Sequence, residues 1–365
     1  MPASLLVTDP AQLTDATASF AGLPAIALDT EFMRERTYYA RLCLLQLAGR
    51  GRIALVDPLA ITDLSPVAAL LGDTAQVKIL HAARQDLEVL YPLLGGVAAP
   101  VFDTQIAAAL LGHPAQMGYG ELVAKITGIV LTKGHARTDW ARRPLSPEQL
   151  HYAADDVRHL ETLRDELGTR LDALGRLPWL QEDCRALQDP ALYVTEPERA
   201  WQRFKGADRL VPQERAALRA LAAWREARAM RRNLPRGWIL TDETLRDAAR
   251  LRPATLAALA ALPGIAAGTV ERSGRELLDV IAAARPEEGE APAAPAEERL
   301  TPEENALLRR LQDRLRGIGA ELGIQPEVLA TRRELTALLR GERTLPVLAG
   351  WRREVAGLPL VAALG

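Results

Sequence analysis

The chain of 365 residues is 48% hydrophobic and 25% charged, and its formal net charge is −2. This composition excludes collagen-like, disulfide-scaffold and wholly disordered proteins, and it is typical of soluble globular domains. At roughly 100–200 residues per domain, the length predicts two or three domains.

The near-neutral total conceals an uneven distribution of charge. The formal charge is −6 over 1–204, +6 over 205–285, −4 over 286–300 and +2 over 301–365. Carboxylates bind cations and arginines bind phosphate, so an acidic first part and a basic second part could serve a metal and a polyanion. Such offsets are also common among surface charges, and charge alone leaves both interpretations open.

Targeting signals and membrane segments are not evident. Cys43 and Cys184 are too few for a disulfide framework, which fits a reducing compartment. The first residues lack the basic flank and apolar run of a secretory signal, and no apolar run reaches the ~18 residues of a membrane helix. We therefore expect a cytoplasmic protein without a membrane partner.

The first 204 residues alternate between strand and helix patterns. Short apolar runs predict strands at 24–29, 42–48, 52–57, 77–81 and 98–102. Helical spacing follows at 63–71, 84–94, 103–111, 118–127 and 147–171. Only Gly49-Arg50-Gly51 separates the second strand from the third, so these two strands form a hairpin. The order predicts an α/β domain over 1–204, a mixed sheet flanked by helices.

Beyond residue 205 only helical patterns occur. They fall at 213–232, 242–251, 254–262, 268–284, 302–317, 325–340 and 345–356. Residues 287–299 are rich in Pro, Ala and Glu, which predicts a flexible linker. We expect two small all-α domains, at 205–286 and 300–365. Similar Trp-Arg runs at 224–226 and 351–354 are weak evidence that the two are repeats.

The strand at 24–29 runs into two acids, Asp29 and Glu31. Side chains alternate along a strand, so both acids point to the same face. Two like charges at this distance raise each other's pKa unless a cation lies between them, which indicates a metal site. An isolated Asp-x-Glu is more often a pair of solvated acids in a loop.

Two further acids occur in helical segments. Asp86 lies in the first turns of the helix after the fourth strand, where an acid can simply complement the helix dipole. In the helix from 147, Tyr152 and Asp156 are four residues apart and share a face, so the phenol could orient a water near the carboxylate. His151 and Asp155 have the same spacing, and spacing alone cannot choose between the two pairs.

Taken together, these segments resemble the DEDDy subgroup of 3′→5′ exonucleases, whose motifs are Asp-x-Glu, an Asp on a helix after a strand, and Tyr-x-x-x-Asp. The stretches 28–49, 80–91, 102–113 and 137–161 are similar in order and spacing to the ribonuclease D family. The resemblance implies a ribonuclease-H-like fold for this domain. It assigns Asp29, Glu31, Asp86 and Asp156 as catalytic, metal-holding carboxylates and Tyr152 as the catalytic residue that orients water.

The resemblance also bears on the choice within the third motif. A sister subgroup uses His-x-x-x-x-Asp, a spacing that His151 and Asp156 satisfy. The run Tyr-Ala-Ala-x-Asp-Val is similar to ribonuclease D and favours Tyr152 with Asp156. Carboxylate ligands without Cys or His suit Mg²⁺ or Mn²⁺, and the family implies two such divalent cations.

Substrate contacts are expected in two places. The resemblance places Lys133 and Arg137 beside the active site as phosphate contacts, and Phe32 or Tyr38 could stack on the terminal base. Residues 210–286 resemble the HRDC domain, a helical nucleic-acid-binding module, and 300–365 resemble a second, more diverged HRDC. The basic excess of the first could follow a phosphate backbone through Arg225, Arg228, Arg231, Arg232 and Arg236.

By resemblance, the chain is a monomeric 3′→5′ exoribonuclease that trims tRNA precursors and other small structured RNAs and releases nucleoside 5′-monophosphates. Two alternatives remain from the sequence. One is a DNA 3′→5′ exonuclease, because no residue reads a 2′-hydroxyl unambiguously. The other is a catalytically weak nucleic-acid-binding protein, although a degenerate core would be expected to lack some of the acids.

Overall fold

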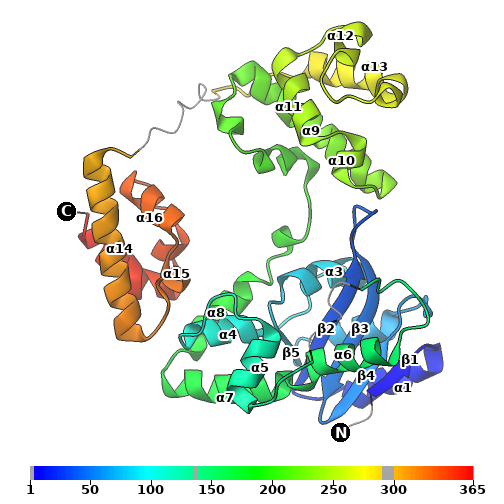
Figure 1. Cartoon of the computed structure of the whole chain (residues 1–365), viewed down its shortest axis with the longest axis vertical. Coiled ribbons are helices and arrows are strands. Elements are labelled where there is room, and N and C mark those ends of the chain that lie inside the picture. The colour runs from blue at the N-terminus through cyan, green and yellow to red at the C-terminus, as the bar shows by residue number, and fades with distance from the viewer. Residues whose placement is uncertain (1–3, 133, 135–137, 290–299, 365) are drawn as a thin grey trace. The chain divides into compact units, whose positions relative to one another are not determined.

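The structure is a computed structural model that describes residues 4–132, 134, 138–289 and 300–364. The chain divides into two compact units (Figure 1). The first comprises Met1–Met33, Leu42–Tyr193 and Leu300–Gly365, and the second comprises Arg34–Arg41 and Val194–Arg299. None of the helices in these described ranges has the length and apolar character that a membrane crossing requires.

A six-stranded mixed sheet forms the centre of the first unit, in the order β1-β4-β3-β2-β5-β6. The strands are β1 Ser4–Val7, β2 Ala25–Met33, β3 Arg41–Gly49, β4 Arg52–Val56, β5 Val77–Leu80 and β6 Val101–Asp103. The predicted hairpin is confirmed, since β3 and β4 are antiparallel with Gly49 opposite Arg52. β2 and β5 are parallel, so their carboxyl ends lie at the same edge of the sheet. The short β1 was not predicted, because only its last residue is fully buried.

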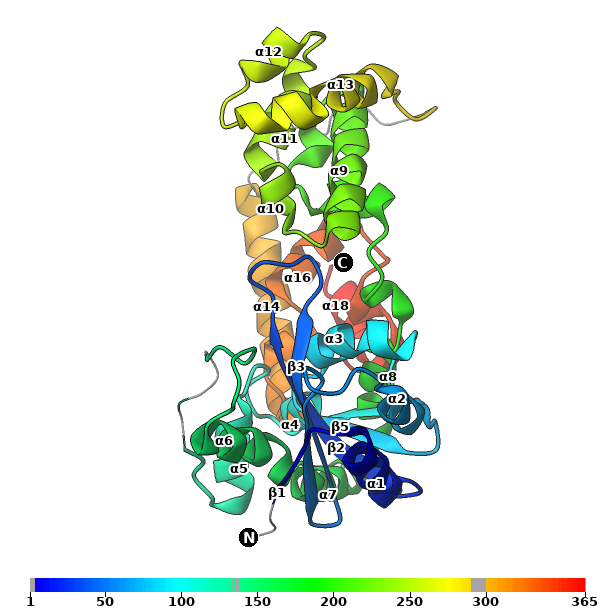
Figure 2. The same ribbon diagram turned by 90° about the vertical axis from the view of Figure 1, so that its right-hand side faces the viewer.

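Helices cover both faces of this sheet (Figure 2). One face packs against α1 Pro10–Phe20, α2 Ser65–Gly72 and α3 Arg84–Leu94, which share a buried cluster with Ile26 and Leu28 of β2. The other face, which includes Ala25 and Ala27 of β2, packs against the helices that follow. These are α4 Thr104–Leu110, α5 Tyr119–Thr127, α6 Pro147–Arg158, α7 Leu160–Ala173 and α8 Leu177–Ala186. The α/β class predicted from the sequence is confirmed.

The helix predicted over 147–171 is two helices. α6 ends and α7 begins at His159, whose φ of −104° and ψ of −1° interrupt the regular α-helix. No Pro or Gly marks this break, so periodicity alone merged the two helices. Helices α1 and α8 were not predicted either.

Residues 300–365 belong to the first unit. Their elements are α14 Pro302–Leu322, α15 Pro326–Leu329, α16 Arg332–Leu339, the 3-10 helix Pro346–Leu348, α17 Gly350–Arg352, the π-helical turn Arg353–Gly357 and α18 Leu358–Ala362. Trp351 stacks on Trp179 of α8 with ring centroids 4.3 Å apart, and Arg352 forms an ion pair with Asp183 at 2.6 Å. The sequence predicts a separate domain over 300–365, because no local pattern encodes a contact between residues so distant in the chain.

The second unit is helical apart from the turn at 34–41. It contains 3-10 helices at Pro197–Arg203 and Ala207–Arg209, then α9 Pro212–Arg232, α10 Arg236–Ile239, α11 Asp242–Leu251, α12 Leu256–Ala260 and α13 Ala267–Ala283. Leu218, Leu221, Leu245 and Leu277 are among the residues of its buried core. The sequence predicts that 34–41 and 194–204 lie in the first domain, whereas they belong to the second unit. Most of the predicted linker, 290–299, lies outside the described residues.

The two helical parts follow the same plan at a constant offset. Helices α9, α10 and α11 begin 90 residues before α14, α15 and α16. Both 21-residue helices end at a residue with a left-handed backbone, Asn233 or Gly323, and a threonine side chain caps both α11 and α16. The Trp-Arg runs at 224–226 and 351–354 do not share this offset, so they are not equivalent positions.

Trp351→Ala should destabilise the first unit by about 3–5 kcal/mol, the usual cost of removing a large buried aromatic side chain. The free energy of unfolding is measured by urea denaturation. Arg353→Ala is the control, because Arg353 pairs only with the neighbouring Glu354 at the surface and its loss should cost below about 1 kcal/mol. Equal stability of the two variants would contradict the role of the Trp179–Trp351 stack.

Candidate active site

Asp29 and Glu31 lie near the end of β2, alternating with the buried Leu28 and Thr30. They share the sheet face of Ala25 and Ala27, which packs against α6 and α7. The predicted alternation is confirmed, because the strand continues to Met33 and both acids point to the same side of the sheet.

Asp86 reaches the same place from α3. β5 lies beside β2 in parallel, and the chain turns from its end into α3, so Asp86 is in the first turn of that helix. Asp86 is 7% exposed and accepts a hydrogen bond of 2.6 Å from the hydroxyl of Thr30. The turn is held by Asp103, whose carboxylate accepts hydrogen bonds from the backbone N–H groups of Ala82 and Ala83 at 3.1 and 2.8 Å.

Helix α6 contributes Tyr152 and Asp156. The helix starts at a capping box of Ser146 and Gln149, and Tyr152 lies one turn before Asp156 on this helix. His151 lies elsewhere on the helix. Its ring is 55% exposed and its Nε2 is 3.3 Å from Asp155, not from Asp156.

These side chains line one cavity of about 270 Å³. Its walls include Asp29, Glu31, Phe32, Asp86, Tyr152 and Asp156. His81, Gln85 and Tyr119 also line it and were not predicted. His81 hydrogen-bonds Thr104 and the carbonyl of Met117, both at 2.9 Å, and the Tyr119 hydroxyl donates to the carbonyl of Asp155. No spacing in the sequence marks these residues, because they come from separate elements.

The electrostatics of the cavity disfavour four ionised acids. Burial, followed by the charges of Asp86, Asp156 and Glu31, raises the pKa of Asp29 well above its ordinary value. Burial and neighbouring carboxylates raise the pKa of Glu31 to about 9. For Asp156 the pKa rises to about 7 and for Asp86 to about 6, with burial as the main cause in both. Burial and the nearby acids also raise the pKa of Tyr152, so its hydroxyl keeps its proton at neutral pH.

The arrangement could hold a cation. Oxygen atoms of Asp29, Glu31 and Asp156 lie within 4.8 Å of one another. All are carboxylates, the hard ligands that suit Mg²⁺ or Mn²⁺. A divalent cation between them would offset both the burial and the mutual repulsion that raise their pKa values.

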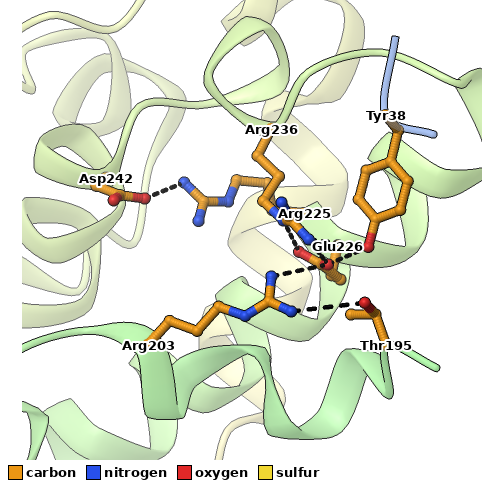
Figure 3. A network of polar contacts seen from close by, with 7 residues as sticks. All are labelled: Tyr38, Thr195, Arg203, Arg225, Glu226, Arg236 and Asp242. Atoms are coloured by element: carbon orange, nitrogen blue, oxygen red, sulfur yellow. Dashed lines mark hydrogen bonds and ion pairs between the residues drawn. The ribbon is translucent and has the colours of Figure 1, made fainter. Parts of the chain in front are cut away.

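Of the predicted substrate contacts in the first domain, only Phe32 lines the cavity. Lys133 and Arg137 lie outside the described residues. Tyr38 does not line the cavity and lies in the second unit, where its hydroxyl donates to Glu226 and the guanidinium of Arg236 is 4.6 Å from its ring centroid (Figure 3). The contacts of Tyr38 with α9 and α10 give no support to the prediction that it stacks on the terminal base, and that prediction stays untested.

The arginines predicted to follow a phosphate backbone separate into two groups. Arg225 and Arg228 are buried and pair with Asp242 and Glu276 at 2.7 and 2.6 Å, and Arg236 pairs with the buried Glu226. Their guanidinium groups are engaged within the second unit, which does not support their assignment as phosphate contacts, and that prediction stays untested. Arg231 and Arg232 are exposed in the last turn of α9, and for these two the prediction stands untested.

Comparisons with known proteins agree on the class of the chain. Residues 5–172 match the family profile described as 3′-5′ exonuclease, and residues 214–281 match the HRDC domain. Ribonuclease D of Gluconacetobacter diazotrophicus is 41% identical over 98% of this chain and 91% of its own length. Ribonuclease D of Pseudomonas paraeruginosa is also 41% identical, over 98% of this chain and 96% of its own length.

Solved structures give the same picture. The crystal structure of Escherichia coli RNase D, an exoribonuclease involved in structured RNA processing, is similar with a TM-score of 0.87 and 33% identity, over 99% of this chain and 98% of that chain. The catalytic core of RRP6 from Trypanosoma brucei has a TM-score of 0.59 and 21% identity, over 77% of this chain and 79% of that chain. The second likeness concerns the fold alone.

Without a divalent cation, the free energy of unfolding should fall as pH rises from about 4.5 to about 9. The acids of the cavity have raised pKa values when folded, at about 6, 7 and 9 for Asp86, Asp156 and Glu31. The folded state then binds more protons than the unfolded state in this window, so stability declines with pH. Urea denaturation in chelator at several pH values measures the slope.

Glu31→Gln should flatten this slope between about pH 7 and 9, because the pKa of Glu31, about 9, places its ionisation in this window. Glu121→Gln, at an exposed acid of α5 that does not line the cavity, should leave the slope unchanged. Added Mg²⁺ or Mn²⁺ should stabilise the wild-type protein more at pH 8 than at pH 5.5. Stability that rises with pH in chelator would contradict the electrostatic description of the cavity.

Proposed function

The chain belongs to the ribonuclease D family of 3′→5′ exoribonucleases, and we propose that it trims the 3′ ends of tRNA precursors and other small structured RNAs. Each cycle hydrolyses the terminal phosphodiester and releases a nucleoside 5′-monophosphate. The observation that carries the proposal is the meeting of four acids from β2, α3 and α6 in one cavity. It is supported by identity of about 40% to ribonucleases D over nearly the whole chain.

Asp29, Glu31, Asp86 and Asp156 are proposed to hold two divalent cations, Mg²⁺ or Mn²⁺. Support comes from three oxygen ligands within 4.8 Å and from pKa values that only a nearby positive charge would return to their ordinary range. When bound, such ions activate the attacking water and stabilise the leaving 3′ oxygen. Asp86 takes part from α3, where the hydroxyl of Thr30 fixes its carboxylate.

Tyr152 is proposed to orient the attacking water. Its hydroxyl is protonated at neutral pH and lies beside Asp156, so it can donate one hydrogen bond and accept another from water. Phe32 lines the same cavity and can contact the terminal base. Lys133 and Arg137 are proposed to contact phosphate, and Arg231 and Arg232 to contact the RNA backbone farther from the cut.

Residues 300–365 are proposed to be a second HRDC domain. The support is the constant offset of 90 residues between α9–α11 and α14–α16, together with the equivalent left-handed helix ends. In this part the helices pack on α8, so we propose that the second HRDC stabilises the exonuclease domain.

Asp156→Asn should lower kcat on 3′-end-labelled RNA by about a thousandfold or more, since it removes a charge that holds a cation, while RNA binding stays near the wild-type level. The assay uses matched RNA and DNA with Mg²⁺ or Mn²⁺, with and without chelator. Asp155→Asn is the control on the same helix, because Asp155 pairs with Arg158 and does not line the cavity. Full activity of Asp156→Asn would contradict the site, and loss of label from DNA alone would overturn the RNA assignment.

Tyr152→Phe should lower kcat by about 10²–10⁴-fold, the range that a positioned proton-transfer group contributes. His151→Ala should stay within about threefold of the wild-type kcat, because its ring is exposed and faces Asp155. Both values come from single-turnover cleavage of the same RNA. A large loss in the His151 variant alone would move the chain to the His-containing subgroup.

A further inference from the structure

The turn between β2 and β3 leaves the sheet and joins the helical unit. Residues Arg34–Arg41 belong to the compact unit formed by Val194–Arg299, although both flanking strands belong to the other unit. The strand that enters this turn is β2, which carries Asp29, Glu31 and Phe32 immediately before it. The turn therefore continues directly from the strand that lines the cavity.

Glu226 of α9 is the centre of the contacts in this turn (Figure 3). It is 1% exposed and accepts a hydrogen bond from the hydroxyl of Tyr38. Arg236 donates to both of its oxygens, each at 2.6 Å, and also reaches the Tyr38 hydroxyl at 3.0 Å. Arg203 adds a longer ion pair of 3.5 Å. A buried carboxylate is stable when it is paired and hydrogen-bonded in this way.

The charges in the cluster agree with its hydrogen bonds. Burial alone would raise the pKa of Glu226, but the hydrogen bonds from Arg236 and Tyr38 and the charge of Arg203 bring that pKa below its ordinary value. Burial and the bond to Glu226 raise the pKa of Tyr38. At neutral pH the ionised carboxylate of Glu226 thus accepts a hydrogen bond from the neutral phenol of Tyr38, a charge-assisted hydrogen bond.

Asn233 holds the backbone of the same turn. Its side-chain oxygen accepts hydrogen bonds of 3.1 Å from the N–H groups of both Tyr38 and Tyr39. Asn233 ends α9 with φ and ψ of 48° and 49°, a left-handed conformation that asparagine tolerates and that turns its side chain away from the helix. Side-chain and backbone contacts therefore fix the turn independently.

We propose that residues 34–41 are a positioning element that couples the HRDC unit to β2, with Glu226 and Asn233 as its positioning residues. The inference rests on the proposed function. RNA contacts made by the helical unit are transmitted through this turn to the strand that carries Asp29 and Glu31, whereas a substrate that makes no contact with the helical unit gains nothing from it. The coupling therefore affects the KM of long substrates and leaves the chemistry at the carboxylates unchanged.

The test uses the full chain with Asn233→Gly, Tyr38→Phe and their combination. Glycine adopts the left-handed conformation of Asn233 without strain, so Asn233→Gly removes only the acceptor for the two N–H groups. Tyr38→Phe removes only the hydroxyl that contacts Glu226. Asp242→Asn is the matched control, since it weakens the 2.7 Å pair between Asp242 of α11 and Arg225 of α9 without touching the turn.

Two readouts are combined. Hydrogen exchange follows the amides of residues 38 and 39, and steady-state kinetics compare a tRNA precursor with a tetraribonucleotide. In the double variant we expect faster exchange at both amides and a KM for the precursor raised about tenfold, the effect of losing hydrogen bonds of ordinary strength. Its kcat on the precursor and both constants on the tetraribonucleotide should stay within about twofold of wild type, as should every value for Asp242→Asn.

Faster exchange with an unchanged KM for the precursor would overturn the coupling, and so would an equal loss on both substrates. Unchanged exchange in the double variant would show that the turn is not held by these residues, which overturns it as well. Cleavage of neither substrate by the wild-type protein would instead refute the proposed function. If the wild-type protein instead cleaves both substrates normally and the variants behave like it, only the coupling is refuted and the proposed function stands.

Discussion

Repulsion among buried carboxylates is the constraint around which the first unit is organised. Asp29 and Glu31 come from one strand, Asp86 from the helix after the neighbouring strand, and Asp156 from a helix on the opposite face. Their raised pKa values show that bringing these acids together in their ionised form lowers the free energy of unfolding. A structure that only needed stability would pair or expose them. The arrangement makes physical sense when positive charge is supplied from outside the chain, as divalent cations do in the proposed reaction.

The surrounding framework holds the acids against that repulsion. Asp103 accepts backbone hydrogen bonds from the turn before α3, and Thr30 fixes the carboxylate of Asp86. Arg143 fixes the segment that leads into α6. It donates hydrogen bonds from two nitrogens to the carboxylate of Asp57, at 2.6 and 2.8 Å, and another to the carbonyl of Cys43. These partners position the four acids, and each of them lies within one of the stretches that resemble the family.

The buried carboxylate of Glu226 is stabilised in the opposite way, by partners within the protein. Arg236 and Tyr38 neutralise it from within the protein, so its pKa is lowered, and it stabilises a contact without a cation. The same contrast divides the five arginines of the helical unit that were predicted to contact a phosphate backbone into two groups. Arg225, Arg228 and Arg236 pair with acids of their own unit, of which only Glu226 is buried, while Arg231 and Arg232 are exposed. Local composition could not distinguish them, because all five lie in one basic stretch.

The sequence by itself determined most of the strands and helices and the motif residues. Alternation put Asp29 and Glu31 on one face, helical spacing put Tyr152 beside Asp156, and helix α11 was predicted at its observed bounds. These features depend on neighbours within a few residues, where periodicity is a sufficient guide. Tertiary structure decided the rest: the entry of His81 and Tyr119 into the cavity, the packing of Trp351 on Trp179, and the capture of Tyr38 by Glu226. Each joins residues far apart in the chain, and such contacts are set by the packing of whole elements, which no local pattern records.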